Sequence, residues 1–337
     1  MMNETVFIPA EKLKDVFFNV LLKYGFEKEK AEACAEIFTT NSVDGVYSHS
    51  VNRFVSFIKL VEKGFVIPNN DPEKVYGMNA LEQWDGKLGA GVLNAMKATD
   101  RAMQIAKDHG MGCVALANTN HWMRGGYYGW QGAKNNFVFI GWTNTIANMP
   151  AWGAVDARLG NNPLVIAVPY NGEAIVLDMA TSQFSYGALE VSTLKNEELP
   201  VHGGFNVRGE LTKKPSEILE SKRVLPVGYW KGAGLSLLLD ILSAILSGGL
   251  STHEIAQRKI EYGLSQVFIA IDLQQLKNYS GIESCINNII TDYKQSTPGE
   301  EKEIVFPGER ILKTRAKNLE NGIPVMKKVW SEIEGLL

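Results

Sequence analysis

Apolar residues in the first seventy or so positions recur at the spacing of one face of a helix. After Pro9 they fall at Leu13, Val16, Phe17, Val20, Leu21 and Tyr24, and Gly25 ends the run. The same spacing predicts helices over residues 31–38 and 51–61, before Gly64 and Pro68 interrupt the pattern. We therefore expect a helical N-terminal part over residues 1–74.

From about residue 75 the pattern changes to short runs of β-branched and aromatic residues separated by helical segments, which is typical of an α/β fold. Strands are predicted over residues 113–117, 137–142, 164–168, 174–177 and 267–271. Helices are predicted over residues 92–107 and 235–246, and the second is apolar enough to be expected in the interior. A mixed α/β domain is expected over residues 75–275.

The C-terminal segment returns to helical spacing over residues 310–319 and 325–336, on either side of a turn at Gly322. Residues 294–303 are rich in charge and contain Pro298 and Gly299, which predicts a solvated loop. We expect residues 276–337 to form a helical C-terminal part that packs with the N-terminal one. The predicted fold class is α/β (α+β), a mixed sheet domain with helical N- and C-terminal parts.

Composition and charge narrow the class of partner. The 337 residues include 34 Lys and Arg against 37 Asp and Glu, a net charge of -3, which disfavours a nucleic-acid partner. The longest apolar stretch, 235–246, is well short of the roughly 20 residues that cross a bilayer, and we find no secretory signal at the N-terminus. The three cysteines are scattered and lack the spacing of a zinc site, so we expect no metal and a cytoplasmic location.

The Gly-x-Gly-x-x-Gly fingerprint of Rossmann dinucleotide-binding domains is missing from the sequence. Two partial matches, at residues 89–91 and 232–234, lack the third glycine. The simpler interpretation is that these glycines permit a turn before a helix. A nucleotide, if one binds, would be held without the Rossmann turn.

Three of the five histidines have structural explanations. Ser251 and Glu254 have the spacing of a capping box around His253. His109 lies where a helix is expected to end, and His202 lies in a glycine-rich turn. The other two histidines carry candidate chemistry.

His49 is followed four residues later by Arg53, so one helical turn would bring an imidazole and a guanidinium to the same face. A carbonyl reduction needs an acid with a pKa near the working pH, and histidine comes closest to that requirement. A guanidinium can bind a substrate carboxylate through two parallel hydrogen bonds. The spacing fits an ordinary surface pair at a helix start equally well, and both interpretations stay open.

His121 lies in an unusually polar loop that follows a predicted strand and also contains Arg124. Loops at the carboxyl ends of strands are where α/β folds bind ligands, although a buried structural histidine is the alternative. Thr145 follows another predicted strand and either supplies a neutral donor to a ligand or closes a turn.

Five runs of residues are rich in rare residue types: residues 45–54 (GVYSHSVNRF), 120–126 (NHWMRGG), 149–153 (MPAWG), 184–187 (FSYG) and 228–232 (GYWKG). In register over nearly the whole chain, they resemble the type-2 malate/L-lactate dehydrogenase family, and within it the branch that acts on sugar acids. The resemblance implies the family's nicotinamide-binding fold, which is unrelated to the Rossmann domain. It also implies a homodimer with active sites at the subunit interface.

The activity implied by the resemblance is NADH-dependent reduction of the 2-keto group of a sugar acid, 2,3-diketo-L-gulonate. His49 matches the proton donor and His121 a rival for that role, while Arg53, Arg124 and Thr145 are expected to bind substrate. Other 2-hydroxy acids (malate, lactate, sulfolactate or ureidoglycolate) are the first alternative. A non-catalytic dimer that binds a nucleotide is the second.

Cofactor contacts carried over from the family fall on three segments. They are Ala174, Ile175, Val176, Leu177, Asp178, Met179 and Ala180; Trp230 and Lys231; and Gly308, Glu309 and Arg310. Two positions depart from the family pattern. Ser50 replaces the glycine that usually follows the histidine, and Arg310 adds a cation that could favour a ribose phosphate, so NADPH is an alternative to NADH.

Overall fold

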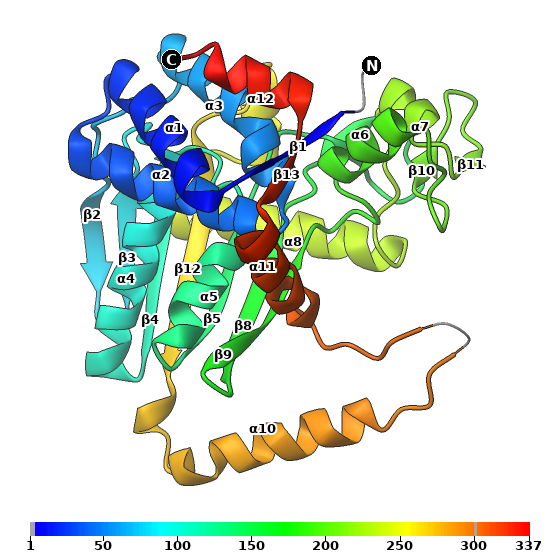
Figure 1. Cartoon of the computed structure of the whole chain (residues 1–337). Coiled ribbons are helices and arrows are strands. Elements are labelled where there is room, and N and C mark those ends of the chain that lie inside the picture. Colours follow the sequence, from blue (N-terminus) through cyan, green and yellow to red (C-terminus); the bar gives the residue numbers. More distant parts are fainter. Residues whose placement is uncertain (1–3, 300–301) are drawn as a thin grey trace.

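The computed structural model describes residues 4–299 and 302–337, and a seven-stranded mixed sheet forms its centre (Figure 1). In spatial order the strands are β2 (Glu73–Met78), β3 (Leu81–Asp85), β4 (Met111–Thr119), β12 (Leu264–Asp272), β5 (Phe137–Thr143), β8 (Leu164–Tyr170) and β9 (Glu173–Met179). Only β3 and β4 run parallel within this sheet; every other neighbouring pair is antiparallel. All five predicted strands are confirmed, and the sheet differs from the parallel sheet of a Rossmann domain.

The central strand β12 determines which loops meet at one edge of the sheet. Because β12 is antiparallel to both neighbours, its N-terminal end lies beside the carboxyl ends of β4 and β5. Leu264 pairs with Thr119, and Gln266 pairs with Thr143. The segments after β4, after β5 and before β12 therefore lie side by side, although they are far apart in sequence.

Helices cover both faces of the sheet. On one face, α4 (Gly91–His109) and α5 (Gly126–Lys134) pack on alternate residues of the strands, among them Leu116, Phe139 and Phe268. On the other face, α8 (Trp230–Ser247) packs through Leu239 against Trp142 and Val267.

The expectation that residues 235–246 form a buried helix is wrong for much of this helix. Leu238 is 58% exposed and Ile245 is 64% exposed. Leu237 and Ile241 are exposed as well, to a smaller extent. The apolar surface of α8 exceeds what one face of the sheet can cover. By length and composition, α8 is also the one helix among the described residues that could span a membrane, a test that a packed helix passes equally.

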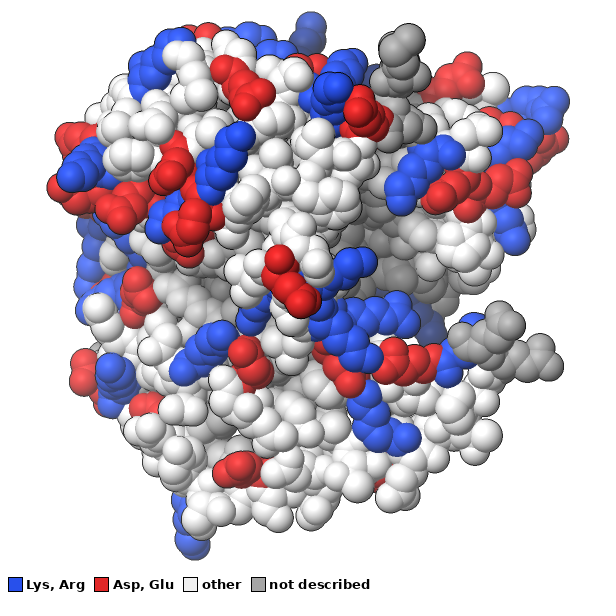
Figure 2. All heavy atoms as spheres, viewed as in Figure 1, with Lys and Arg blue, Asp and Glu red and all other residues white. Residues whose placement is uncertain are grey.

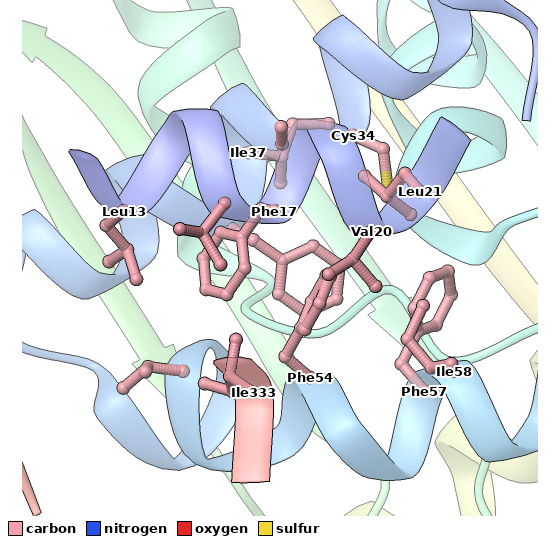
Figure 3. Close-up of a cluster of buried hydrophobic side chains, with 14 of the residues drawn as sticks. Leu13, Phe17, Val20, Leu21, Cys34, Ile37, Phe54, Phe57, Ile58 and Ile333 are labelled. Atoms are coloured by element: carbon pink, nitrogen blue, oxygen red, sulfur yellow. The ribbon is translucent and has the colours of Figure 1, made fainter. Parts of the chain in front are cut away.

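The N-terminal part contains α1 (Ala10–Lys23), α2 (Lys28–Val43), the short 3-10 helix η1 (Tyr47–His49) and α3 (Val51–Glu62). Phe17 and Phe54 stack with ring centroids 4.1 Å apart, and Ile333 from the C-terminal end joins the same core (Figure 3). The three predicted helices of this part are confirmed.

The C-terminal part contains α10 (Tyr279–Lys294), α11 (Glu309–Asn321), β13 (Ile323–Met326) and α12 (Lys327–Glu334). The helix predicted over 325–336 is wrong at its start, because Val325 pairs with Val6 of β1 (Thr5–Ile8) in a two-stranded sheet. This long-range pairing overrides the local helical pattern. Helix α11, β13 and α12 contact the N-terminal part, whereas α10 has no buried residue and lies at the far end of the sheet (Figure 1).

A small lobe lies beside the sheet, with a core that includes Leu189, Leu199 and Ile218. Its elements are β6 (Met149–Pro150), β7 (Ala157–Leu159), α6 (Tyr186–Lys195), β10 (Gly204–Phe205), β11 (Leu211–Thr212), α7 (Pro215–Ser221) and α9 (Thr252–Gln257). The 3-10 helix η2 (Leu273–Gln275) lies outside this lobe, where it follows β12 and contacts α10. The capping box of Ser251 and Glu254 is confirmed at the start of α9.

Candidate active site

His49 and His121 face the same cavity, and their ring centroids are 5.8 Å apart. The cavity has a volume of about 550 Å³, and Arg53 and Thr145 also line it. It lies beside a hollow in the surface between β13 and α6, and Figure 2 shows the surface indented there. The structure thus brings four predicted site residues from three separate segments into one place.

One wall of this cavity comes from the helical part. The chain leaves α2 through Gly45 and forms η1, which ends at His49. Ser50 has non-helical backbone angles (φ -148, ψ -109) and turns the chain into α3, which carries Arg53 in its first turn. The buried Ser50 fixes this turn, because its hydroxyl donates to the Val46 carbonyl (3.1 Å) and accepts from the Ser42 hydroxyl (2.9 Å). Ser50 is therefore a structural residue in the connection that holds the His49 backbone.

The side chains on this wall have few partners. His49 Nδ1 lies 2.9 Å from the Ser48 hydroxyl. Arg53 is exposed to the cavity and makes no ion pair within residues 4–299 and 302–337. Its guanidinium is available for a ligand carboxylate.

The other wall comes from the sheet edge. His121 follows β4, and its Nδ1 accepts a hydrogen bond from the Met123 amide at 2.9 Å. Asn120 next to it is buried, and its side-chain Nδ2 donates to the Phe65, Leu88 and Gly89 carbonyls. A neutral imidazole that accepts at Nδ1 carries its proton on Nε2, so His121 presents an N–H donor.

Thr145 and Glu261 complete the sheet-edge wall. The Thr145 hydroxyl donates to Asn161 Oδ1 (3.2 Å) and to Asn162 Oδ1 (3.3 Å), so it is already committed to local contacts. Glu261 Oε2 accepts from the Ile146 amide at 3.0 Å. Glu261 has no signal in the sequence, since a single acid before a strand carries no distinctive pattern.

The two imidazoles have different electrostatic surroundings. Burial lowers the pKa of His49, the Asp178 carboxylate acts in the opposite direction, and Arg53 and Arg124 lower it again. Burial also lowers the pKa of His121 to well below the usual value, and the charges of Arg53 and His49 add to that effect. A carboxylate thus favours the protonated form of His49, whereas the charges that act on His121 oppose its protonation.

A second cavity of about 520 Å³ lies between β9 and the start of α11. Residues 176–178 line one side, and Gly308 and Arg310 line the other. The Val176 amide donates to the Pro307 carbonyl at 3.0 Å, and Gly308 has φ +90. A Cβ on Gly308 would lie 3.2 Å from the Val176 nitrogen, so only glycine permits this approach without strain.

Asp178 lines the second cavity, and its Oδ2 accepts from the Gly126 amide at 2.7 Å. Its charge also favours the protonated form of His49, which faces the first cavity.

Several residues of the three expected cofactor segments are placed elsewhere. Trp230 and Lys231 begin α8, are exposed and line neither cavity. Ala174 is buried in the sheet core. The Glu309 carboxylate accepts from Lys294 Nζ (2.7 Å) and from the Phe306 amide (3.0 Å), which anchors α11 to α10.

Arg124, expected to bind substrate, does not line the cavity of His49 and Arg53. It is buried and paired with Asp44, which is 1% exposed and also accepts from Arg315 Nε at 2.6 Å. This cluster joins α2, the loop before α5 and α11. The residues that the structure describes contain no group of three or more His, Cys, Asp or Glu arranged to hold a metal ion.

The chain matches the family model described as malate/L-lactate dehydrogenase over residues 8–334. It is 45% identical to a 2,3-diketo-L-gulonate reductase of Citrobacter koseri over 98% of this chain and 99% of that protein. It is 46% identical to the protein of the same name from Escherichia coli K12, again over 98% of this chain and 99% of that protein.

Solved structures give the same result. The sulfolactate dehydrogenase of Methanocaldococcus jannaschii superposes with a TM-score of 0.90 at 29% identity, covering 98% of this chain and 96% of that one. The malate dehydrogenase of Entamoeba histolytica has a TM-score of 0.93 at 24% identity, covering 99% of this chain and 97% of that one, and shows the fold alone. The predicted fold class is confirmed.

Fold, cavity chemistry and relatives together define an oxidoreductase that acts on a hydroxyl or keto group. The chain belongs to the malate/L-lactate dehydrogenase family.

Proposed function

We propose that the protein reduces the 2-keto group of 2,3-diketo-L-gulonate to give 3-dehydro-L-gulonate, with NADH as the reductant. The observation that carries the proposal is the meeting of His49, Arg53 and His121 in one cavity. The substrate assignment is supported by full-length relatives of that name at 45% and 46% identity.

The cavity between β9 and α11 fits a nicotinamide dinucleotide. Gly308 and Arg310 line it at the N-terminus of α11, where the helix dipole and the Arg310 cation both favour a phosphate. When bound, the dinucleotide supplies the hydride that C2 of the substrate receives. Residues 176–178, Gly308 and Arg310 would hold it. NADPH is the alternative cofactor, because the Arg310 cation could also bind its ribose phosphate.

In this proposal three residues of the substrate cavity bind the substrate, donate the proton and hydrogen-bond a substrate oxygen. Arg53 binds the substrate carboxylate, which fixes the adjacent keto group between the two histidines. His49 in its protonated form gives its proton to the C2 oxygen as the hydride arrives at C2. His121 is held neutral and donates from Nε2 to an oxygen of the substrate without losing its proton.

We propose a homodimer in the cytoplasm as the working form. The exposed apolar residues of α8 and the unburied helix α10 offer surfaces that a second copy could cover. The same association could bring Trp230 and Lys231 toward a cofactor cavity, which they do not reach within one chain. Sedimentation should give twice the chain mass of 37.2 kDa, and a single chain mass would contradict this. The three cysteines are free, which fits a reducing compartment.

The reaction is tested by following absorbance at 340 nm with NADH or NADPH and a panel of 2,3-diketo-L-gulonate, pyruvate, oxaloacetate, sulfopyruvate and a buffer blank. Oxidation of NADH with the diketo acid well above the other acids is the expected result. Activity only on the other acids would replace the substrate and keep the reaction. No oxidation with any acid would favour a nucleotide-binding dimer without catalysis.

A further inference from the structure

Glu261 is an acid of the substrate cavity that the reaction described above does not use. It immediately precedes the turn into the central strand β12, and it lines the same cavity as Arg53 and His121. Burial raises its pKa, while the Ile146 amide and the Arg53 charge act in the opposite direction.

The backbone around Glu261 is held firmly. The Tyr262 ring packs against Phe65, with centroids 4.6 Å apart, and the Arg258 guanidinium lies 4.5 Å from the Tyr262 ring centroid. Gly263 has φ +71, and β12 begins at the next residue with pairing on both sides. The carboxylate is therefore presented from a fixed position rather than from a loop that moves freely.

Only part of the hydrogen-bonding capacity of Glu261 is used. Oε2 accepts from the Ile146 amide at 3.0 Å, whereas Oε1 has no donor within the described ranges. A carboxylate can accept about four hydrogen bonds, and leaving a half-buried one short of donors is unfavourable. Arg53 forms no ion pair with it among the described residues, so the remaining acceptor capacity is open to donors that enter the cavity.

We propose that Glu261 accepts hydrogen bonds from the chain hydroxyls of the substrate and thereby selects polyhydroxylated 2-keto acids over short ones. The inference rests on the proposed function for its site and reaction, and it adds the residue that distinguishes substrates. Arg53 holds the carboxylate end and Glu261 receives the hydroxyl-bearing remainder, so the two opposite charges of the cavity fit the two ends of a sugar acid.

A site built to hydrogen-bond a hydroxyl group discriminates strongly against an analogue that lacks it, because the polar group of the protein is then left unpaired. Glu261→Leu should therefore lower kcat/KM for 2,3-diketo-L-gulonate by about 10- to 100-fold and change kcat/KM for pyruvate by less than about threefold. Glu261→Gln keeps an acceptor for the Ile146 amide and should show a smaller loss with the same selectivity. Glu283→Gln, an exposed acid on α10, is the matched control and should leave both values unchanged.

The ratio between the two substrates is the decisive readout. Equal losses on both acids would overturn the inference, since they would assign Glu261 to support of the Ile146 loop alone. Unchanged values on both would overturn it as well.

Failure of the proposed function is distinguishable, because it shows in the wild type as absent turnover of the diketo acid. In that case the test measures how L-gulonate and propionate, as competitive inhibitors, slow the reduction of whichever acid the wild type does turn over. Glu261→Leu should then raise the inhibition constant of L-gulonate about tenfold and leave that of propionate unchanged. An unchanged constant for L-gulonate would overturn the inference.

Discussion

The two walls of the substrate cavity are built differently. On the sheet-edge wall, every functional side chain has a local partner: His121 with the Met123 amide, Thr145 with Asn161, and Glu261 with the Ile146 amide. On the helical wall, the His49 ring has one hydrogen-bond partner among the described residues, the neighbouring Ser48 hydroxyl, and Arg53 has no ion pair there.

This difference separates side chains that are fixed before substrate binds from side chains that are free to pair with the substrate. Groups with committed hydrogen bonds keep one geometry and one protonation state, which suits them to position a ligand. A histidine and an arginine with free capacity can respond when substrate arrives, because the substrate supplies the missing partners. The comparison predicts that substitutions on the helical wall change rate most, and that those on the sheet-edge wall change selectivity or binding.

The sharpest test of this division compares the two histidines. His49→Ala should lower kcat by about 100- to 10,000-fold, the range for loss of a general acid. His121→Ala should cost only about tenfold, as expected for one neutral hydrogen bond. Steady-state kinetics gives both values, and fluorescence titration should show NADH binding unchanged in His49→Ala. The reverse order of the two losses would transfer the acid role to His121.

A pair of arginine substitutions tests whether free and committed cations behave differently. Arg53→Ala should raise KM and lower kcat, with kcat/KM falling about 100-fold and the melting temperature unchanged. Arg124→Ala leaves the buried Asp44 with Arg315 alone, and should lower the free energy of unfolding by about 3 kcal/mol. Calorimetry and kinetics on both variants check this. An Arg124→Ala protein with unchanged stability and a raised KM would show instead that Arg124 binds substrate.

A smaller effect is expected when the Asp178 carboxylate is replaced. Asp178 favours the protonated form of His49, so Asp178→Asn should lower the pKa of His49 further. Reduction needs protonated His49, so the rate falls as pH rises through that pKa. The falling limb of the pH profile should therefore move to lower pH. The asparagine can still accept from the Gly126 amide, and an unmoved pH profile would contradict the account.

The same comparison explains what the sequence could predict. The four-residue spacing of His49 and Arg53 predicted a shared helix face. The two residues do line one cavity, although the non-helical Ser50 separates the helices that carry them. His121 and Thr145 followed predicted strands, and the loop rule placed them near a ligand. Glu261 depends on the antiparallel placement of β12 between β4 and β5, a long-range pairing that no local pattern reports.

Two errors have the same origin. The pairing of β13 with β1 overrode the helical spacing at Val325. The apolar residues of α8 indicated burial, but a single chain leaves much of that surface exposed. Sequence periodicity reports that a face is apolar and does not report what covers it.

The central claim is that His49 is the proton donor of the reduction. It is tested most directly by the pH dependence of the single-turnover rate of 2,3-diketo-L-gulonate reduction in the wild type, His49→Gln and His121→Gln. The account predicts a wild-type rate that falls as pH rises, and a His49→Gln rate at least about 100-fold lower with no such fall. A His49→Gln protein that keeps the wild-type pH profile, beside a His121→Gln protein that loses it, would contradict the claim.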